Sequence, residues 1–255
     1  MNSVWSDPPY SLSLSGEEVH VWRASLNLPG PCIQRMLQTL APEERERADR
    51  FRFAEHRERY IAGRGLLRNI LSRYLNEEPD DIEFCYNRQG KPALKALHGA
   101  PDFRFNLSHS STLALYAVAR NREVGVDVES VRSDLPHEEI AEHFFSAREI
   151  AALRNLPVHL RDEGFFNCWT RKEAYLKARG DGLALSLERF TVSLAPGEPA
   201  ALLDNLDDPE ELSRWSLQKL TSLSGYIAAL AVEGNGWRLQ CWQWPDRSKS
   251  ERSAR

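Results

Sequence analysis

The chain has 255 residues, of which 42% are hydrophobic and 27% are charged, and its formal net charge at pH 7 is −4. This composition is that of an ordinary globular protein with a sizeable core, and the length allows one large domain or two smaller ones. The slightly acidic balance argues against a general nucleic-acid binder.

The N-terminus, the apolar runs and the cysteines restrict where the protein works. Residues 1–10 lack the basic patch and apolar core of a signal peptide, and the strongest apolar run, Tyr226–Val232, is far too short to span a bilayer. Four cysteines occur singly with no C-x-x-C pair, which argues against a disulfide framework and a zinc site. We therefore expect a cytoplasmic protein with no nucleic-acid or membrane partner.

Apolar patterns in the first half of the chain predict strands around a helical region. Val19–Arg23 alternates and is expected to be a strand. Pro42 and two glutamates after it begin a long, arginine-rich helical stretch, because proline and acidic residues favour a helix N-terminus. Arg64–Leu75 has the pattern of an amphipathic helix, and residues 103–110 and 113–119 are expected to return to the core as strands.

The next predicted strand, V-G-V-D-V-E-S at 124–130, places two carboxylates side by side. Its three valines fall on one face, whereas Asp127 and Glu129 share the other face. Acidic residues are poor strand formers, and like charges this close repel each other. A bound metal ion would offset that cost, although an exposed polar strand face explains the pair equally well when the strand is taken alone.

The second half repeats the plan loosely. An apolar loop is expected between Asp134 and Phe145, and Ser146 with Glu149 forms a candidate capping box that begins a helix over 147–156. A longer helix is expected over Phe165–Arg179, ended by G-D-G at 180–182. Three strands then follow, around residues 190–194, 215–220 and 226–232.

A local repeat links the two halves. S-H-S-S-T-L-A-L-Y-A-V at 108–118 aligns without gaps with S-L-S-G-Y-I-A-A-L-A-V at 222–232. Together with the matching order of elements, this repeat predicts an α+β fold of two similar lobes, residues 1–122 and 123–244. The tail at 245–255 lacks apolar residues and is expected to be disordered.

The helix W-T-R-K-E-A-Y-L-K at 169–177 provides a third carboxylate and a lysine. Trp169, Glu173 and Lys177 lie at i, i+4 and i+8, along one side of the helix, where a surface ion pair would explain the two charges. Combined with the strand pair, however, Glu173 completes a set of three hard oxygen donors of the kind that Mg²⁺ prefers. Lys177 could face a developing phosphate charge, so the pattern indicates metal-assisted phosphoryl chemistry.

The substrate side is less specific. Neither a G-x-x-x-x-G-K-[ST] loop nor a G-x-G-x-x-G fingerprint is present, which argues against the P-loop and Rossmann classes. Basic residues of the first half, namely Arg47, Arg59, Lys91 and His109, are candidates for phosphate contacts, although arginines clustered on a helix usually form a solvated face. On its spacing alone, His109 could equally cap backbone groups before the following strand.

An ordered set of motifs resembles the Sfp-type 4′-phosphopantetheinyl transferases. The set comprises F-N-L-S-H-S (105–110), G-V-D-V-E (125–129), F-F-S-A-R-E (144–149) and W-T-R-K-E-A-Y-L-K (169–177). Shorter matches are P-E-E-R-E-R-A-D-R-F at 42–51, G-K-P at 90–92 and G-D-G-L at 180–183. The resemblance extends from about residue 40 to residue 232, which is most of the chain.

The resemblance implies a pseudo-dimer of two lobes that binds coenzyme A and Mg²⁺ between them. Such an enzyme transfers the 4′-phosphopantetheine arm to a serine of an apo acyl or peptidyl carrier protein and releases adenosine 3′,5′-bisphosphate. The carrier could belong to fatty-acid, polyketide or non-ribosomal peptide synthesis. A fused pseudo-dimer is expected to work as a monomer.

By position, the resemblance also implies roles for individual residues. Asp127, Glu129 and Glu173 match the Mg²⁺ ligands, Mn²⁺ being an alternative at an all-oxygen site. Lys177 would contact the pyrophosphate and assist the leaving group, and either Glu173 or Glu129 could act as the general base. The coenzyme A contacts would come from Ser108, His109 and Arg59 at the 3′-phosphate, Lys91 and Pro92 at the adenine, and Arg47 at a further phosphate.

The sequence leaves the roles of two glutamates open. Glu149 is a weaker site candidate because its capping role explains it equally well, and the negative charge of Glu44 puts in doubt a nucleotide contact that lysines make in some relatives. Phe144 and Phe145 favour a protein-docking edge. The alternative functions are a Mg²⁺-dependent phosphodiesterase or pyrophosphatase that uses the same carboxylates, and a non-catalytic coenzyme A-binding protein.

Overall fold

The computed structural model describes residues 3–95, 102–180 and 186–245. Residues 246–255 of the expected tail, and positions 181 and 182 of the expected helix stop, lie outside the described residues. The elements of the first half are β1 (Trp5–Ser6), β2 (Glu18–Ser25), α1 (Gly30–Gln38), α2 (Pro42–Asp49), α3 (Ala54–Leu75), β3 (Phe84–Tyr86), β4 (Pro92–Leu94), β5 (Phe103–Ser110) and β6 (Leu113–Arg120).

The second half begins at β7. Its elements are β7 (Val124–Ser130), α4 (His137–Phe144), α5 (Ala147–Asn155), α6 (Arg161–Arg179), β8 (Phe190–Val192), β9 (Leu202–Asn205), α7 (Glu211–Arg214), β10 (Trp215–Leu220), β11 (Tyr226–Glu233) and β12 (Arg238–Gln243), with 3-10 turns at Val158–Leu160 and Leu187–Arg189. Each strand predicted from the sequence is therefore present, within a few residues of its expected bounds.

The two halves share one topology. β6 lies between β2 and β5, and β11 lies between β7 and β10, with every one of these neighbouring pairs antiparallel. Each half also has one long helix, α3 or α6, followed by a small antiparallel pair, β3–β4 or β8–β9. The aligned repeat places β6 on β11, and the aligned residues Ser111 and Gly225 both have left-handed φ angles, of 52° and 76°. The expected α+β fold of two similar lobes is confirmed.

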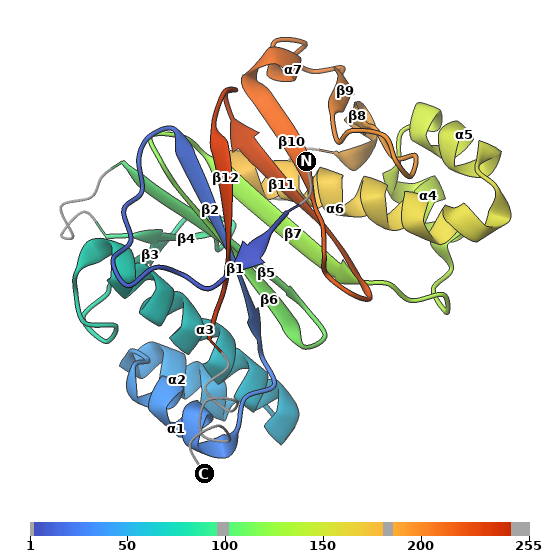
Figure 1. Cartoon of the computed structure of the whole chain (residues 1–255). Helices are drawn as coiled ribbons and strands as arrows, with labels where there is room; N and C mark the ends of the chain where they lie inside the picture. Colours follow the sequence, from blue (N-terminus) through green and yellow to red (C-terminus); the bar gives the residue numbers. More distant parts are fainter. Residues whose placement is uncertain (1–2, 96–101, 181–185, 246–255) are drawn as a thin grey trace.

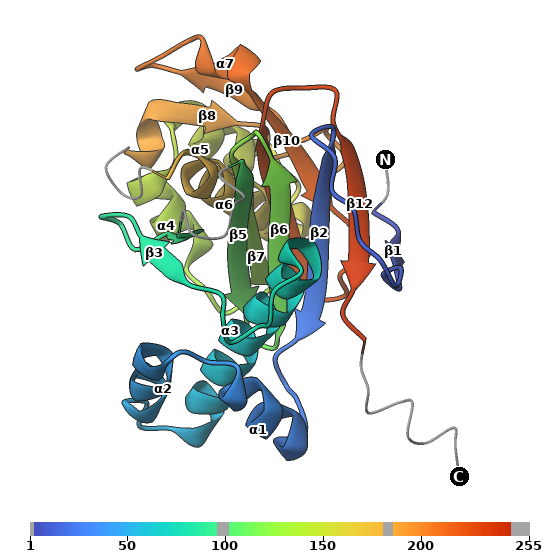
Figure 2. The ribbon, with the colours of Figure 1, turned by 90° about the vertical axis from the view of Figure 1, so that its left-hand side faces the viewer.

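Strands from both ends of the chain complete the first sheet, whose order is β1-β12-β2-β6-β5. β12 pairs parallel to β2, and β1 pairs parallel to β12, as Figure 2 shows for the row of strands beside α3. The last strand of the second half thus lies in the sheet of the first half. Backbone hydrogen bonds therefore join the halves, in addition to side-chain packing.

The helices and sheets form layers (Figure 1). α3 covers the outer face of the first sheet and α6 covers the outer face of the second, each over its own buried cluster. A third cluster fills the space between the sheets and includes the valines at 124, 126 and 128. Burying those valines turns the opposite face of β7, which carries Asp127 and Glu129, toward α6.

The expected long helix after Pro42 is two helices, which corrects the prediction. α2 ends at Asp49 and α3 begins at Ala54, ten residues before the predicted start at Arg64. In one continuous helix, Glu44 and Arg64 would lie about 30 Å apart along the axis. The reversal between the helices instead brings Glu44 against α3, where its carboxylate accepts hydrogen bonds from Arg64 Nε at 2.6 Å and Arg68 Nε at 2.7 Å.

A second correction concerns the segment between Asp134 and Phe145, which is helical over α4 rather than a loop. Pro136 precedes this helix and acidic residues occupy its first turn, both of which favour a helix N-terminus. Phe145 is buried and stacks on Phe165, whereas Phe144 is 43% exposed. α6 begins four residues earlier than predicted and ends where Gly180 takes a left-handed φ of 77°. No described helix is long and apolar enough to cross a membrane.

Candidate active site

Gly125 sets the distance between β7 and α6. A Cβ atom at this position would lie 2.1 Å from the carbonyl oxygen of Ala174 and 2.3 Å from the backbone nitrogen of Ala178. Only glycine permits this approach, since a side chain would push the helix away. The close crossing brings Glu173 and Lys177 of α6 next to Asp127 of the strand.

Asp127 is the centre of the resulting polar cluster and is only 3% exposed. Its Oδ1 accepts hydrogen bonds from Lys177 Nζ at 2.6 Å and from Ser108 Oγ at 2.9 Å, and Lys177 also donates to Ser108 Oγ at 3.0 Å. Its Oδ2 is buried and has no hydrogen-bond partner in the described part of the chain. A buried carboxylate oxygen without a donor is costly, so this atom is a ready ligand for a cation.

Glu129 and Glu173 share the environment of Asp127. Burial raises the pKa of Glu129, and the Asp127 carboxylate raises it further, while a hydrogen bond from Ser110 opposes the increase. The pKa of Glu173 is raised by burial first and then by Asp127. Three carboxylates thus repel one another in a poorly solvated space, and the Lys177 ammonium lies beside them as a compensating positive charge. Within the described ranges, no group of three or more His, Cys, Asp and Glu side chains is placed so that it could hold a metal ion as it stands.

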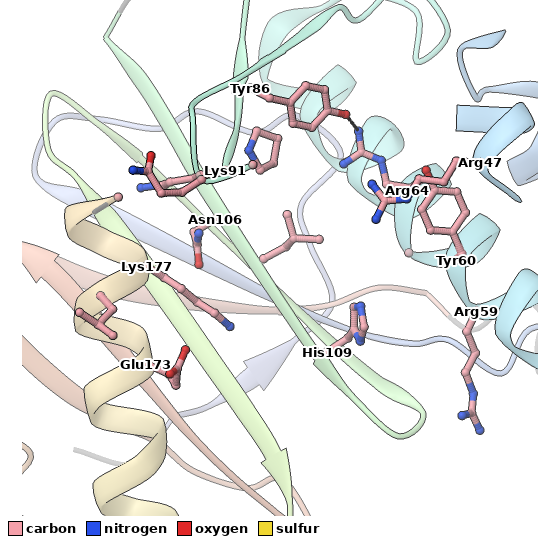
Figure 3. A pocket seen from close by; sticks show the side chains of 17 residues that line it. Arg47, Arg59, Tyr60, Arg64, Tyr86, Lys91, Asn106, His109, Glu173 and Lys177 are labelled. Carbon is pink, nitrogen blue, oxygen red and sulfur yellow. Dashed lines mark hydrogen bonds between the residues drawn. The ribbon is translucent and has the colours of Figure 1, made fainter. Parts of the chain in front are cut away.

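A cavity of about 450 Å³ opens beside this cluster, between the two lobes (Figure 3). The first lobe contributes side chains from α2, α3, β5 and the β3–β4 hairpin, and the second contributes one side of α6. Of the residues predicted from the sequence, the cavity is lined by Arg47, Arg59, Lys91, Pro92, His109, Glu173 and Lys177. A single cavity therefore collects the predicted phosphate-binding and adenine-binding side chains together with two residues of the carboxylate cluster.

Ser108, Asp127 and Glu129 do not line this cavity. Ser108 is 7% exposed, and its hydroxyl is hydrogen-bonded to Asp127 and Lys177 rather than open to the cavity. The structure thus associates Ser108 with the carboxylate cluster, whereas the resemblance places it at the 3′-phosphate.

The predicted basic residues differ in how they are held. Burial lowers the pKa of His109, and the nearby Lys177 ammonium lowers it further. Arg59 pairs with Glu55 one helical turn away. Lys91 Nζ donates to the carbonyl oxygen of Ala178 at 3.1 Å, and so ties the β3–β4 hairpin to the end of α6.

Several residues that line the cavity were not predicted from the sequence, including Tyr60, Arg64, Tyr86 and Asn106. Tyr60 and Arg64 could have been predicted, because they lie one helical turn apart and Tyr60 directly follows the predicted residue Arg59. Asn106 lies two residues before Ser108 and so shares its strand face. No sequence pattern around Tyr86 indicates a role in the site. Its hydroxyl accepts a hydrogen bond from Arg64 at 2.9 Å.

The two glutamates left open by the sequence are structural. Glu44 is 3% exposed, pairs with two buried arginines and does not line the cavity. Glu149 forms the predicted capping box with Ser146, which is confirmed, and its carboxylate also lies 2.8 Å from the buried Lys172 ammonium. Neither carboxylate is therefore available to the cavity.

Comparisons with known proteins identify the class of enzyme. Residues 29–121 match the family described as 4′-phosphopantetheinyl transferase, N-terminal, and residues 123–231 match the 4′-phosphopantetheinyl transferase superfamily. The chain is 42% identical over 244 residues to the 4′-phosphopantetheinyl transferase HetI of Nostoc sp., which covers 96% of this chain and 100% of that protein.

More distant relatives agree. The 4′-phosphopantetheinyl transferase Sfp of Bacillus subtilis is 33% identical over 63% of this chain and 69% of its own. The L-aminoadipate-semialdehyde dehydrogenase-phosphopantetheinyl transferase of Mus musculus is 28% identical over 84% of this chain and 74% of its own. The chain belongs to the 4′-phosphopantetheinyl transferase superfamily. It is accordingly a transferase that moves the phosphopantetheine group of coenzyme A to a carrier protein.

Proposed function

We propose that the cavity binds coenzyme A, and that Asp127, Glu129 and Glu173 hold a divalent metal ion, Mg²⁺ or Mn²⁺, beside its pyrophosphate. The observation that carries this proposal is the buried Oδ2 of Asp127, which has no hydrogen-bond partner among the described residues and lies next to Lys177 at the edge of the interlobe cavity. The acceptor is a serine hydroxyl of an apo acyl or peptidyl carrier protein, as used in fatty-acid, polyketide or non-ribosomal peptide synthesis.

The donor set fits such an ion. All three residues offer hard oxygen donors, which suit Mg²⁺ and Mn²⁺. Burial first, and then their mutual repulsion, raise the pKa values of Glu129 and Glu173; Lys177 and, for Glu129, the Ser110 hydrogen bond oppose the increase. When bound, the ion would supply charge stabilisation to the pyrophosphate oxygens. A small movement of the glutamates is required, because the cluster as it stands is not a formed metal site.

The first-lobe side of the cavity suits the nucleotide. Arg47, Arg59 and His109 line it with groups that can bind phosphate, and we assign the 3′-phosphate to His109 and Arg59. Lys91 and Pro92 border the adenine at the β3–β4 hairpin. Ser108 does not line the cavity but holds Asp127 and Lys177 in place through hydrogen bonds.

The transfer forms one bond and breaks one. The serine oxygen attacks the phosphorus that carries pantetheine, the bridging P–O bond of the pyrophosphate breaks, and adenosine 3′,5′-bisphosphate leaves. Lys177, held toward the cavity by Asp127, stabilises the charge that grows on the leaving phosphate. The serine proton passes to Glu173, directly or through one water, because Glu173 is the member of the carboxylate set that lines the cavity.

A single chain contains every part of this site. The cavity takes residues from both lobes, so no second copy is needed to complete it. We therefore propose that the enzyme acts as a monomer.

Intact-mass spectrometry of apo carrier proteins tests the proposal. A panel of acyl and peptidyl carriers is incubated with this protein, coenzyme A and Mg²⁺, with EDTA as the control, and adenosine 3′,5′-bisphosphate is quantified in parallel. We expect one phosphopantetheine per carrier, an equal amount of nucleotide product and no reaction in EDTA. Cleavage of coenzyme A with no gain on any carrier would indicate a phosphodiesterase instead.

A further inference from the structure

The seam between β5 and β7 is made by side chains. β5 and β7 are edge strands of two different sheets. Three side chains on one face of β5 nevertheless accept hydrogen bonds from backbone N–H groups of β7. These hydrogen bonds are Val126 N to Asn106 Oδ1 at 3.0 Å, Val128 N to Ser108 Oγ at 3.4 Å and Ser130 N to Ser110 Oγ at 3.0 Å. Alternate residues of β5 thus satisfy the backbone donors that a neighbouring strand would otherwise satisfy.

Ser110 makes a second contact from the same atom. Its hydroxyl accepts from Ser130 N and donates to Glu129 Oε2 at 2.8 Å. A hydroxyl has one hydrogen, and the backbone donor occupies one side of the oxygen, so the hydrogen is directed at the carboxylate. Ser110 therefore fixes the position of the Glu129 carboxylate relative to the backbone that carries it.

Glu129 depends on this contact more than Asp127 depends on Ser108. Asp127 is also held by Lys177, whereas Ser110 is the one hydrogen-bond partner of the Glu129 carboxylate in the described part of the chain. Arg132 lies near enough to attract Glu129 electrostatically, and it lines a neighbouring pocket of about 600 Å³ that Ser110 also borders. Without the Ser110 hydroxyl, the carboxylate is free to turn toward Arg132 and away from Asp127.

We propose that Ser110 is a positioning residue that holds Glu129 ready to bind the metal ion. This inference rests on the proposed function, since it takes Glu129 as a ligand. Groups that hydrogen-bond to metal ligands typically change metal affinity or activity by about 10- to 100-fold when removed. The competing explanation is that Ser110 only joins the lobes through Ser130.

Thr112 offers a matched control for that explanation. It lies in the same β5–β6 hairpin, and its hydroxyl reaches Tyr226 of the second lobe at 3.2 Å without touching a carboxylate. Thr112→Val thus removes a hydroxyl contact between the lobes and leaves the metal-binding cluster unchanged.

The test measures Mn²⁺ binding directly, through the electron paramagnetic resonance signal of free Mn²⁺, with coenzyme A present. Ser110→Ala is expected to raise the Mn²⁺ dissociation constant about 10-fold. Ser110→Thr, which keeps the hydroxyl, should stay within about two-fold of wild type, as should Thr112→Val. Urea unfolding of each variant establishes that the proteins compared are folded.

The outcomes separate the two proposals. If the wild type binds Mn²⁺ and Ser110→Ala binds it equally well, Ser110 does not position Glu129 and only this inference fails. The same conclusion follows if Thr112→Val weakens Mn²⁺ binding as much as Ser110→Ala. If the wild type itself retains no Mn²⁺, the metal assignment fails and the inference falls with it.

Discussion

Arg59 and His109 both line the interlobe cavity and a neighbouring pocket, and we assign them to the 3′-phosphate of coenzyme A. We predict that Arg59→Gln and His109→Gln each reduce the preference for coenzyme A over 3′-dephospho-coenzyme A by about 10-fold, because a hydrogen bond to a charged group contributes about 1.5–3 kcal/mol. Steady-state kcat/KM for both substrates measures this. Arg57→Gln is the control, since Arg57 pairs with Asp49 outside the cavity. Equal losses for both substrates would contradict the assignment.

His20 is a buried histidine that the chemistry does not use. It is 3% exposed, and its Nδ1 lies 2.9 Å from the Tyr74 hydroxyl, which also accepts a hydrogen bond from Trp22 Nε1. The Tyr74 hydroxyl can therefore donate its own proton to Nδ1 of a neutral imidazole. Burial correspondingly lowers the pKa of His20 from 6.5 to about 4.

The lowered pKa of His20 predicts a pH dependence of stability. Because the folded-state pKa lies below the unfolded value, its contribution is complete above pH 6.5 and is lost as the pH falls toward 4. The loss is about 3 kcal/mol, at 1.36 kcal/mol per pH unit. Urea unfolding of wild type and His20→Asn at pH 7 and pH 4 should differ in pH dependence by that amount. Parallel pH profiles would contradict the prediction.

Among the elements, the crossing of α6 over β7 positions the carboxylate cluster. We predict that Gly125→Ala lowers the free energy of unfolding by about 3 kcal/mol or more, as expected when a well-packed contact is overfilled. It should also lower transfer activity in the protein that remains folded, since α6 carries Glu173 and Lys177. Urea unfolding and initial rates measure both effects. Gly30→Ala is the control, because a Cβ there meets no atom within 4 Å; matching behaviour of the two variants would refute the role of the crossing.

The pairing of α2 with α3 depends on the buried Glu44. Removing one partner of a buried ion pair typically costs about 3–5 kcal/mol, and we predict a loss of this size for Glu44→Ala. Coenzyme A affinity should fall as well, because α2 carries Arg47 to the cavity edge. Urea unfolding and calorimetric titration are the measurements. Glu46→Ala, at an exposed site that pairs with Arg50 at 3.9 Å, should change neither quantity; a stable Glu44→Ala protein with normal affinity would contradict the account.

For the whole molecule, the sequence was most informative where a local pattern of residues was compatible with a single local structure. The alternation of V-G-V-D-V-E-S predicted a strand with its valines buried and its acids together, and the structure has both. The capping box at Ser146 and the repeat that relates β6 to β11 were likewise visible as local patterns. Such features depend on neighbours in the chain, which the sequence shows directly.

Features that depend on distant partners could not be predicted in this way. The break between α2 and α3 allows Glu44 to form an ion pair with Arg64, which lies twenty residues later in the chain. Ser108 turns toward Asp127 because β5 and β7 meet at a seam between sheets, which no spacing within either strand reveals. The position of β12 in the first sheet could not be predicted from local sequence either, because it depends on pairing with the distant strand β2.

We propose that one interlobe site, centred on Asp127, performs the transfer. The most direct measurement is intact-mass spectrometry of an apo carrier protein with coenzyme A and Mg²⁺, comparing wild type with Asp127→Asn. The variant keeps the size of the side chain but removes the charge that holds Lys177 and would bind the ion. We predict one phosphopantetheine per carrier with wild type and a rate at least about 100-fold lower with the folded variant. Transfer by Asp127→Asn at a rate near wild type would contradict the account.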